Sequence, residues 1–268
     1  MNILITILVI CAVLIFMIAP KMFNRADRTP FYGRHYAHRG LFDNATDAPE
    51  NSLAAFKKAV DAGYGIELDV QLSKDNKLVV FHDASLKRMC GVDGKVWEYT
   101  LEELKQMKLA DSNETIPTFE EFLALVDGKV PFILEFKLDR VQTEVCRLAN
   151  EVLKNYKGVY CIESFHPLAL LWYRKNRPDV MRGQLCEEFF RNEVYKGQLL
   201  FMILPYMPFN FLTRPDFVAY SHEHAHNISR RICKAMGGLS VAYTIKSVEE
   251  YEAAKDKFEL FIFDSCIL

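Results

Sequence analysis

The sequence predicts an α/β protein, a TIM (β/α)8 barrel preceded by one N-terminal transmembrane helix. Eight short apolar, strand-like runs alternate with helical patterns between residues 34 and 268, which is the rhythm and length of such a barrel. Charged residues stand at alternate positions in two of these runs. An uncharged run at residues 3–19 predicts the preceding helix. A doubly wound open sheet has the same alternation and remains the alternative fold.

The N-terminal run, ILITILVICAVLIFMIA, contains no charged residue. At about 1.5 Å per residue, this run with a little flanking sequence nearly spans a hydrocarbon core of roughly 30 Å. Residues 1–20 are therefore interpreted as a transmembrane anchor. A cleaved signal peptide is the alternative, but no basic segment precedes the run and no clear small-x-small site ends it. Residues 21–33 form a predicted basic linker to the barrel domain, residues 34–268.

Apolar runs and their spacing define the elements expected within that domain. Barrel strands are expected at residues 36–39, 66–71, 132–137, 159–164, 181–185, 217–221, 240–245 and 260–264. A further run at 77–82 follows the turn sequence SKDN and predicts a hairpin with 66–71. Helical patterns are expected at residues 51–62, 118–127, 140–156, 167–176, 223–236 and 247–256.

The composition narrows the class of protein. The chain has 268 residues and a formal net charge of −2, which gives no reason to expect a nucleic-acid partner. Its seven cysteines are scattered singly without CxxC pairs. This pattern is typical of a reduced protein with buried thiols and not of a disulfide framework or a zinc site. Nothing in the sequence predicts an oligomeric state.

Three acidic residues lie within predicted strands. Residues i and i+2 of a strand face the same side, so Glu67 and Asp69 project together, as do Glu135 and Lys137. Charges within an apolar strand are costly unless they are paired or bind a metal. Carboxylates Glu67, Asp69 and Glu135 therefore predict an oxygen-rich site for one hard divalent cation, Mg²⁺ or Ca²⁺.

Basic and imidazole side chains accompany these carboxylates at the predicted strand ends. Arg39 and Lys137 supply fixed positive charge suited to a phosphate group. His38 and His82 exchange protons near neutral pH. Singly, each residue has a structural explanation, such as a hydrogen-bonded histidine at a strand end. Together and in this order they indicate phosphoryl chemistry.

At these residues the chain resembles the glycerophosphodiester phosphodiesterases. The resemblance runs from about residue 35 nearly to the C-terminus, and a match in several parts is more specific than any single motif. The matching segments are His38-Arg39-Gly40, Pro49-Glu50-Asn51-Ser52, Glu67-Leu68-Asp69-Val70, Lys74-Asp75-Asn76, His82-Asp83, Ile116-Pro117-Thr118-Phe119-Glu120-Glu121 and Glu135-Phe136-Lys137.

The resemblance implies a TIM barrel, a divalent metal ion, and hydrolysis of a phosphodiester to glycerol phosphate and an alcohol. Water or the 2-hydroxyl group of the glycerol could attack the phosphorus. Glu50 is expected to orient a catalytic group, while Asn51 or Ser52 caps the following helix. The roles carried over are the acid/base pair His38 and His82, the metal ligands Glu67, Asp69 and Glu135, and the phosphate contacts Arg39 and Lys137.

The C-terminal region departs from the family pattern. Tyr243-Thr244-Ile245-Lys246 stands where family members typically have a W-T-V-N-like strand end, and the chain closes on FIFDSCIL in place of G-x-x-T-D-x-P. Tyr243 keeps an aromatic wall, but Lys246 adds a charge near the mouth. These changes bear on the specificity for the glycerol and the leaving group.

The expected substrates are glycerophosphodiesters and lysophospholipids. The apolar segment 199–217 is either core or a hydrophobic lip that meets lipid. We expect the anchor to hold the barrel mouth near the bilayer. A related phospholipase of the C or D type is one alternative function, and a non-catalytic barrel that binds phospho-ligands at the membrane is another.

The localisation follows from charge around the N-terminal helix. Lys21, Arg25, Arg28 and Arg34 follow the helix, and no Lys or Arg precedes it. Positive residues beside a membrane helix favour the cytoplasmic side. The sequence therefore predicts a single-pass protein of the cell membrane with its catalytic domain in the cytoplasm, which also suits the unpaired cysteines.

Overall fold

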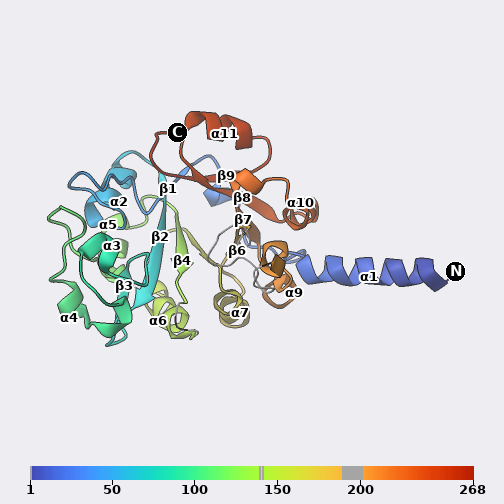
Figure 1. The fold of residues 1–268 in the computed structure, drawn as a ribbon, viewed down its shortest axis with the longest axis horizontal. Helices are drawn as coiled ribbons and strands as arrows, with labels where there is room; N and C mark the ends of the chain where they lie inside the picture. The colour runs from blue at the N-terminus through green and yellow to red at the C-terminus, as the bar shows by residue number, and fades with distance from the viewer. Residues whose placement is uncertain (1, 139, 141, 189–201) are drawn as a thin grey trace.

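Eight parallel strands close into a barrel in the computed structural model, which describes residues 2–138, 140, 142–188 and 202–268 (Figure 1). The first strand pairs with both the second and the last, so the described sheet closes and the open-sheet alternative is excluded. The barrel strands are β1 (Tyr36–His38), β2 (Gly65–Leu72), β4 (Phe132–Phe136), β5 (Tyr160–Ser164), β6 (Arg182–Cys186), β7 (Phe217–Ser221), β8 (Leu239–Ile245) and β9 (Leu260–Phe263).

The predicted hairpin is present and extends the barrel wall at β2. Strand β3 (Leu78–Val80) pairs antiparallel with β2, with Leu72 opposite Leu78 and Val70 opposite Val80. Asn76 takes the positive φ that the turn requires. Because the hairpin folds back along β2, it carries the following residue pair, His82 and Asp83, to the ends of the barrel strands.

Helices follow the strands as predicted, with shorter bounds. The main helices are α2 (Leu53–Asp61), α5 (Phe119–Val126), α6 (Glu144–Leu153), α7 (Pro167–Asn176), α10 (Ile228–Ala235) and α11 (Val248–Ala254). Ser52 caps α2 by accepting a hydrogen bond from the Ala55 amide, as one of the two predicted caps. Asn227 caps α10, so that helix begins later than the pattern predicted.

Short helices in the connections were not predicted. The structure contains α3 (Lys87–Cys90), α4 (Leu101–Leu104) and α9 (Asn210–Thr213). Four residues are about one turn, which is too short to show a helical period in the sequence. Two parts of the predicted segments, residue 141 and residues 199–201, lie outside the described residues.

The predicted basic linker packs onto the barrel. Phe31 is buried in the same apolar cluster as Tyr36 and Phe217, and the Tyr36 hydroxyl donates to the Phe31 carbonyl at 2.9 Å. The Arg28 guanidinium donates to the carbonyl groups of Asp216 and Gly237, which directly precede β7 and β8. This segment therefore covers the N-terminal end of the barrel.

Helix α1 (Asn2–Ile18) projects away from the barrel, with the N-terminus at its far end (Figure 1). Its 17 residues extend about 26 Å, short of a hydrocarbon core of roughly 30 Å. Across the described residues, no helix combines the length and the hydropathy that crossing a membrane requires. The prediction of a transmembrane helix is therefore not confirmed.

Helix α1 joins the barrel at the N-terminal ends of the strands. The Lys21 amide donates to the Pro215 carbonyl at 2.8 Å, just before β7. The Asn210 side-chain amide and the Cys233 thiol donate to the Ile18 carbonyl. Active sites of such barrels lie at the C-terminal ends of the strands. The expectation that the helix holds the barrel mouth at a bilayer is wrong, because its attachment point lies at the opposite end.

Candidate active site

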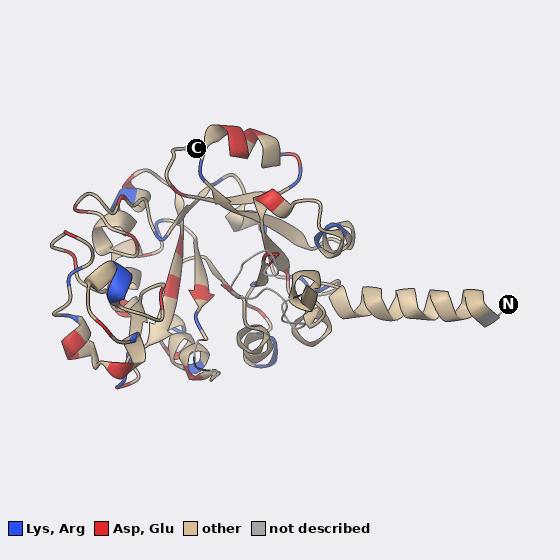
Figure 2. Ribbon diagram, viewed as in Figure 1, with Lys and Arg blue, Asp and Glu red and all other residues tan. Residues whose placement is uncertain are grey.

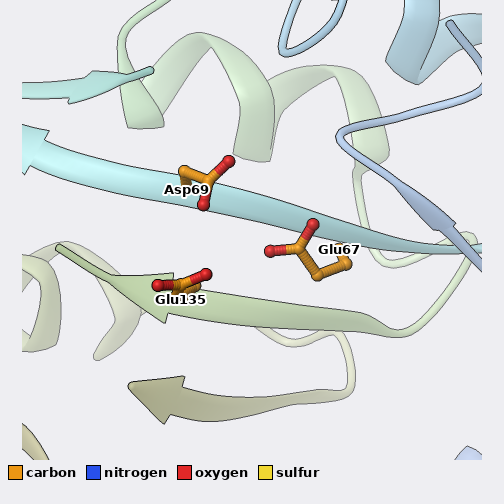
Figure 3. A group of neighbouring side chains, drawn as sticks. All are labelled: Glu67, Asp69 and Glu135. Atoms are coloured by element: carbon orange, nitrogen blue, oxygen red, sulfur yellow. The ribbon is translucent and has the colours of Figure 1, made fainter. Parts of the chain in front are cut away.

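Three buried carboxylates meet at the C-terminal ends of β2 and β4 (Figure 3). Asp69 and Glu135 are register partners across the two strands, and Glu67 lies two residues before Asp69 on the same side of β2. Oxygen atoms from the three side chains lie within 4.8 Å of one another. The sheet register thus brings together the three residues that the sequence predicted as metal ligands.

The electrostatics of this acidic cluster are unbalanced. Burial and the neighbouring charges of Asp69 and Glu135 raise the pKa of Glu67 well above its usual range. Burial also raises the pKa of Glu135, although Lys137 opposes that shift. For Asp69, burial is outweighed by nearby positive charge, Lys137 first, and its pKa lies well below the usual range. The cluster therefore carries more carboxylate than the adjacent cations neutralise.

A hard divalent cation fits this donor set. Glu67, Asp69 and Glu135 offer only oxygen ligands, which Mg²⁺ and Ca²⁺ prefer. The mutual repulsion that raises the pKa of two of them is what a bound divalent charge would offset. The residues present thus fit the predicted cofactor, a single divalent metal ion.

A fourth buried carboxylate, Glu163, was missed as a site residue. It lies on β5 directly opposite Glu135 in the strand register. Burial raises its pKa well above the usual range, and the charge of Glu135 adds to this shift. The alternating charges of β2 and β4 had their counterpart in the sequence CIES, where Glu163 stands inside an apolar run. Its presence increases the negative character of the site.

The two predicted phosphate contacts form ion pairs with the cluster. Lys137 Nζ lies 2.9 Å from Asp69 Oδ1 and 2.7 Å from Glu135 Oε1. Arg39 Nη1 lies 2.8 Å from Glu50 Oε1, and its Nε lies 3.5 Å from Asp69 Oδ2. Both cations are therefore held at the edge of the acidic site by carboxylates.

His38 ends β1 and is fixed by a carboxylate from the far end of the chain. Its Nδ1 lies 2.9 Å from Asp264 Oδ2, directly after β9, while Nε2 lies 3.9 Å from Glu67 Oε2. Burial lowers the pKa of His38 despite the hydrogen bond to Asp264, which favours the neutral imidazole. Asp264 was not predicted, and its signal was an acidic residue at the end of the last apolar run, FIFD.

His82 has a carboxylate partner of its own. Its Nδ1 lies 2.6 Å from Oδ1 of the adjacent Asp83. Arg88, on α3, donates from Nε to Asp83 Oδ2 at 2.7 Å and from Nη2 to Glu50 Oε1. Glu50 also accepts from Arg39, so one carboxylate links the two arginines beside the histidine and the acidic cluster. Arg88 was not predicted, because nothing in its sequence spacing relates it to Glu50.

A cavity of about 900 Å³ opens beside His82, Glu135 and Lys137. Its far walls are apolar and include Phe165, Leu204 and Phe209. The predicted aromatic residue Tyr243 packs edge-on against Phe165, and its hydroxyl donates to the Cys186 carbonyl at 2.9 Å. Tyr243 thus supports the wall that the sequence analysis assigned to it.

Fold and site together define a class: a (β/α)8 barrel with an acidic divalent-cation site and two carboxylate-bound imidazoles at the strand ends. The chain belongs to the glycerophosphoryl diester phosphodiesterase family, whose family model matches residues 38–236.

Relatives and solved structures agree with this membership. The chain is 34% identical over 163 residues to a glycerophosphodiester phosphodiesterase of Caldanaerobacter subterraneus, covering 56% of this chain and 65% of that relative. It is 29% identical over 151 residues to lysophospholipase D GDPD1 of Rattus norvegicus, covering 52% and 46%. The chain therefore spans less than two thirds of the length of these relatives.

The fold also matches a solved structure. A phosphodiesterase from Oleispira antarctica, in complex with the product sn-glycerol-3-phosphate, superposes with a TM-score of 0.71 at 25% identity. The match covers 88% of this chain and 94% of that one.

Proposed function

We propose that this protein is a metal-dependent phosphodiesterase that hydrolyses glycerophosphodiesters to glycerol phosphate and an alcohol. The observation that carries the proposal is the pair of imidazoles beside the acidic cluster, each with Nδ1 bound to an aspartate. That arrangement leaves each Nε2 to exchange a proton. A barrel that only binds phospho-ligands has no need of two such groups.

The divalent ion would be held by Glu67, Asp69 and Glu135. When bound, such an ion polarises the phosphoryl oxygen and offsets the negative charge that develops there. Lys137 and Arg39 lie beside these ligands, so their charges are placed to hold the phosphate group. The substrate phosphate competes with the carboxylates that these two cations contact in the free protein.

The two histidines divide the proton transfers. His38 has a lowered pKa and is therefore suited to accept the proton of the attacking hydroxyl group. His82 then protonates the oxygen of the leaving alcohol. Asp264 and Asp83 hold the protons on Nδ1 of the two rings, which keeps each Nε2 lone pair or proton directed away from its aspartate.

The proposal is tested with the purified full chain and soluble glycerophosphodiesters. Glycerophosphocholine, glycerophosphoethanolamine and glycerophosphoglycerol should each yield glycerol phosphate in the presence of Mg²⁺ or Ca²⁺. A protein that binds these compounds without releasing glycerol phosphate under any metal condition would be a non-catalytic barrel.

A second substrate class, lysophospholipids, is favoured by the apolar walls of the cavity. Leu204 and Phe209 line the cavity, and the neighbouring Met202, Ile203 and Tyr206 are exposed. An acyl chain bound there would extend from the phosphate site onto an apolar surface. The similarity to a relative named lysophospholipase D supports the same class. Turnover of glycerophosphocholine without turnover of lysophosphatidylcholine, in detergent and in vesicles alike, would leave this segment as core.

We also propose that α1 attaches the domain to the cell membrane, with the barrel in the cytoplasm. The support is the row of basic residues after α1 and the seven free cysteines. A cysteine introduced at the exposed Asn113, with the native thiols replaced, should label with an impermeant maleimide only after lysis. Prompt labelling of intact cells would place the domain outside.

A further inference from the structure

Helix α1 presents apolar side chains on every side. All residues from 3 to 16 are exposed, and Figure 2 shows no charged residue along the helix. Its packing partners in the described part of the barrel include α9 and α10, which contact its C-terminal end. A helix that is hydrophobic all round is normally covered by protein or by lipid. The root of the helix shows which covering fits.

Two arginines at this root bind neutral acceptors. Arg214 Nη1 donates to the carbonyl groups of Phe16 and Ala19 at 3.1 and 2.9 Å, and its guanidinium stacks on the Phe16 ring. Arg174 Nη1 donates to the carbonyl groups of Phe211 and Leu212. These contacts satisfy hydrogen bonds without neutralising charge.

The positive charge of this pair is uncompensated. Among the described residues, neither Arg174 nor Arg214 forms an ion pair with a carboxylate. The nearby Asp179 is paired with Arg177 at 2.7 Å. Burial lowers the pKa of Arg214, and the like charge of Arg174 adds to the shift. An anion between these two guanidinium groups would relieve this repulsion.

A groove of about 1040 Å³ joins the two arginines to the apolar helix. Ala12, Ile15 and Phe16 line it on the side of α1, and Lys21, Arg174 and Arg214 line it on the barrel side. A free phosphate ion would leave the apolar half of this groove exposed to water. An occupant with an anionic group next to a hydrocarbon chain matches both halves.

We propose that this groove, the α1-root groove, binds an anionic phospholipid of a bilayer. The headgroup phosphate lies at Arg174 and Arg214, and the acyl chains run along α1. The groove lies at the N-terminal ends of β6, β7 and β8, opposite the acidic cluster, so lipid binding there is separate from catalysis. The bilayer then covers α1 while the catalytic end of the barrel remains free of this contact.

The test is co-sedimentation of the full chain with vesicles of phosphatidylcholine alone or mixed with phosphatidylglycerol. The unmodified chain should bind the anionic vesicles more tightly, and salt should reduce the difference. One basic residue near an anionic surface contributes about fivefold in affinity, so Arg174→Gln with Arg214→Gln should weaken binding to anionic vesicles roughly 25-fold. Binding to neutral vesicles should change little.

Two matched double variants complete the design. Lys57→Gln with Arg147→Gln removes the same charge from exposed sites on α2 and α6 and should leave the lipid preference intact. Arg174→Lys with Arg214→Lys keeps the charge and should retain most of the preference. Circular dichroism of each variant shows that it is folded.

Three results would overturn the proposal. Equal binding of the unmodified chain to neutral and anionic vesicles would show that α1 binds lipid without headgroup recognition. Unchanged binding by the Arg174→Gln, Arg214→Gln variant would place the recognition elsewhere. Self-association through α1 that excludes vesicles would identify a second copy of the chain as its covering.

Discussion

Asp264 Oδ2 lies 2.9 Å from His38 Nδ1, although the two residues stand 226 positions apart in the chain. The parallel pairing of β1 with β9 closes the barrel and places the two strand ends side by side. A carboxylate at Nδ1 fixes the ring and its tautomer, so that Nε2 is the nitrogen available to the substrate. The same relationship recurs between Asp83 and His82.

Replacing Asp264 should therefore impair turnover through His38. We expect Asp264→Asn to lower kcat by about 10- to 100-fold with little change in KM, because the ring loses its orienting charge while the phosphate site remains intact. Ser265→Ala removes only a hydroxyl that donates to Asp264 and serves as the control, with a small effect. Steady-state kinetics with glycerophosphocholine give both constants, and a change confined to KM would refute the positioning role.

The two histidines should respond differently to the leaving group. His38→Ala and His82→Ala should each lose about 10²–10⁴ in rate with glycerophosphocholine. A nitrophenyl phosphodiester has a leaving group that needs little protonation, so it should restore most of the rate of His82→Ala and little of that of His38→Ala. Equal restoration of both variants would contradict separate base and acid roles.

Glu50 should stabilise the fold in a pH-dependent way. Burial opposes ionisation of Glu50, but hydrogen bonds from Arg88 and the charges of Arg39 and Arg88 lower its pKa from 4.5 to about 2. A lowered carboxylate pKa adds stability that is fully present above about 4.5 and is lost as the pH falls toward 2. Glu50→Gln should cost roughly 3 kcal/mol in free energy of unfolding at neutral pH.

Denaturant unfolding at several pH values measures this contribution. The difference between Glu50→Gln and the unmodified chain should shrink steadily between pH 4.5 and pH 2. Glu120→Gln, on the exposed surface of α5, is the control. A difference that stays constant over this range would show that packing, and not the ionised carboxylate, accounts for the role of Glu50.

Sequence pattern predicted the parts of this molecule that depend on local periodicity. Alternating charges in apolar strands identified Glu67, Asp69 and Glu135, since a parallel barrel brings i and i+2 positions of neighbouring strands together. Asp264 and Arg88 were missed because their partners are distant in sequence and only barrel closure or a short helix brings them near. No local signal encodes such contacts.

The N-terminal region shows the opposite limit. Its composition predicted a helix, and the helix α1 is present. The residues after it were predicted as a linker because they are basic and contain proline, but Phe31 and Arg28 attach them to the end of the barrel. A basic residue in a sequence does not reveal whether its donors face water or bind backbone carbonyl groups.

The central claim is that turnover of a glycerophosphodiester requires one divalent ion held by Glu67, Asp69 and Glu135. The most direct measurement is release of glycerol phosphate from glycerophosphocholine by the purified chain, in excess EDTA and after adding back Mg²⁺ or Ca²⁺, for the unmodified protein and for Glu135→Gln. We expect EDTA to abolish turnover of the unmodified protein, either ion to restore it, and Glu135→Gln to need far more metal or to remain inactive while folded. Full turnover in EDTA, or an unchanged metal requirement in Glu135→Gln, would contradict the account.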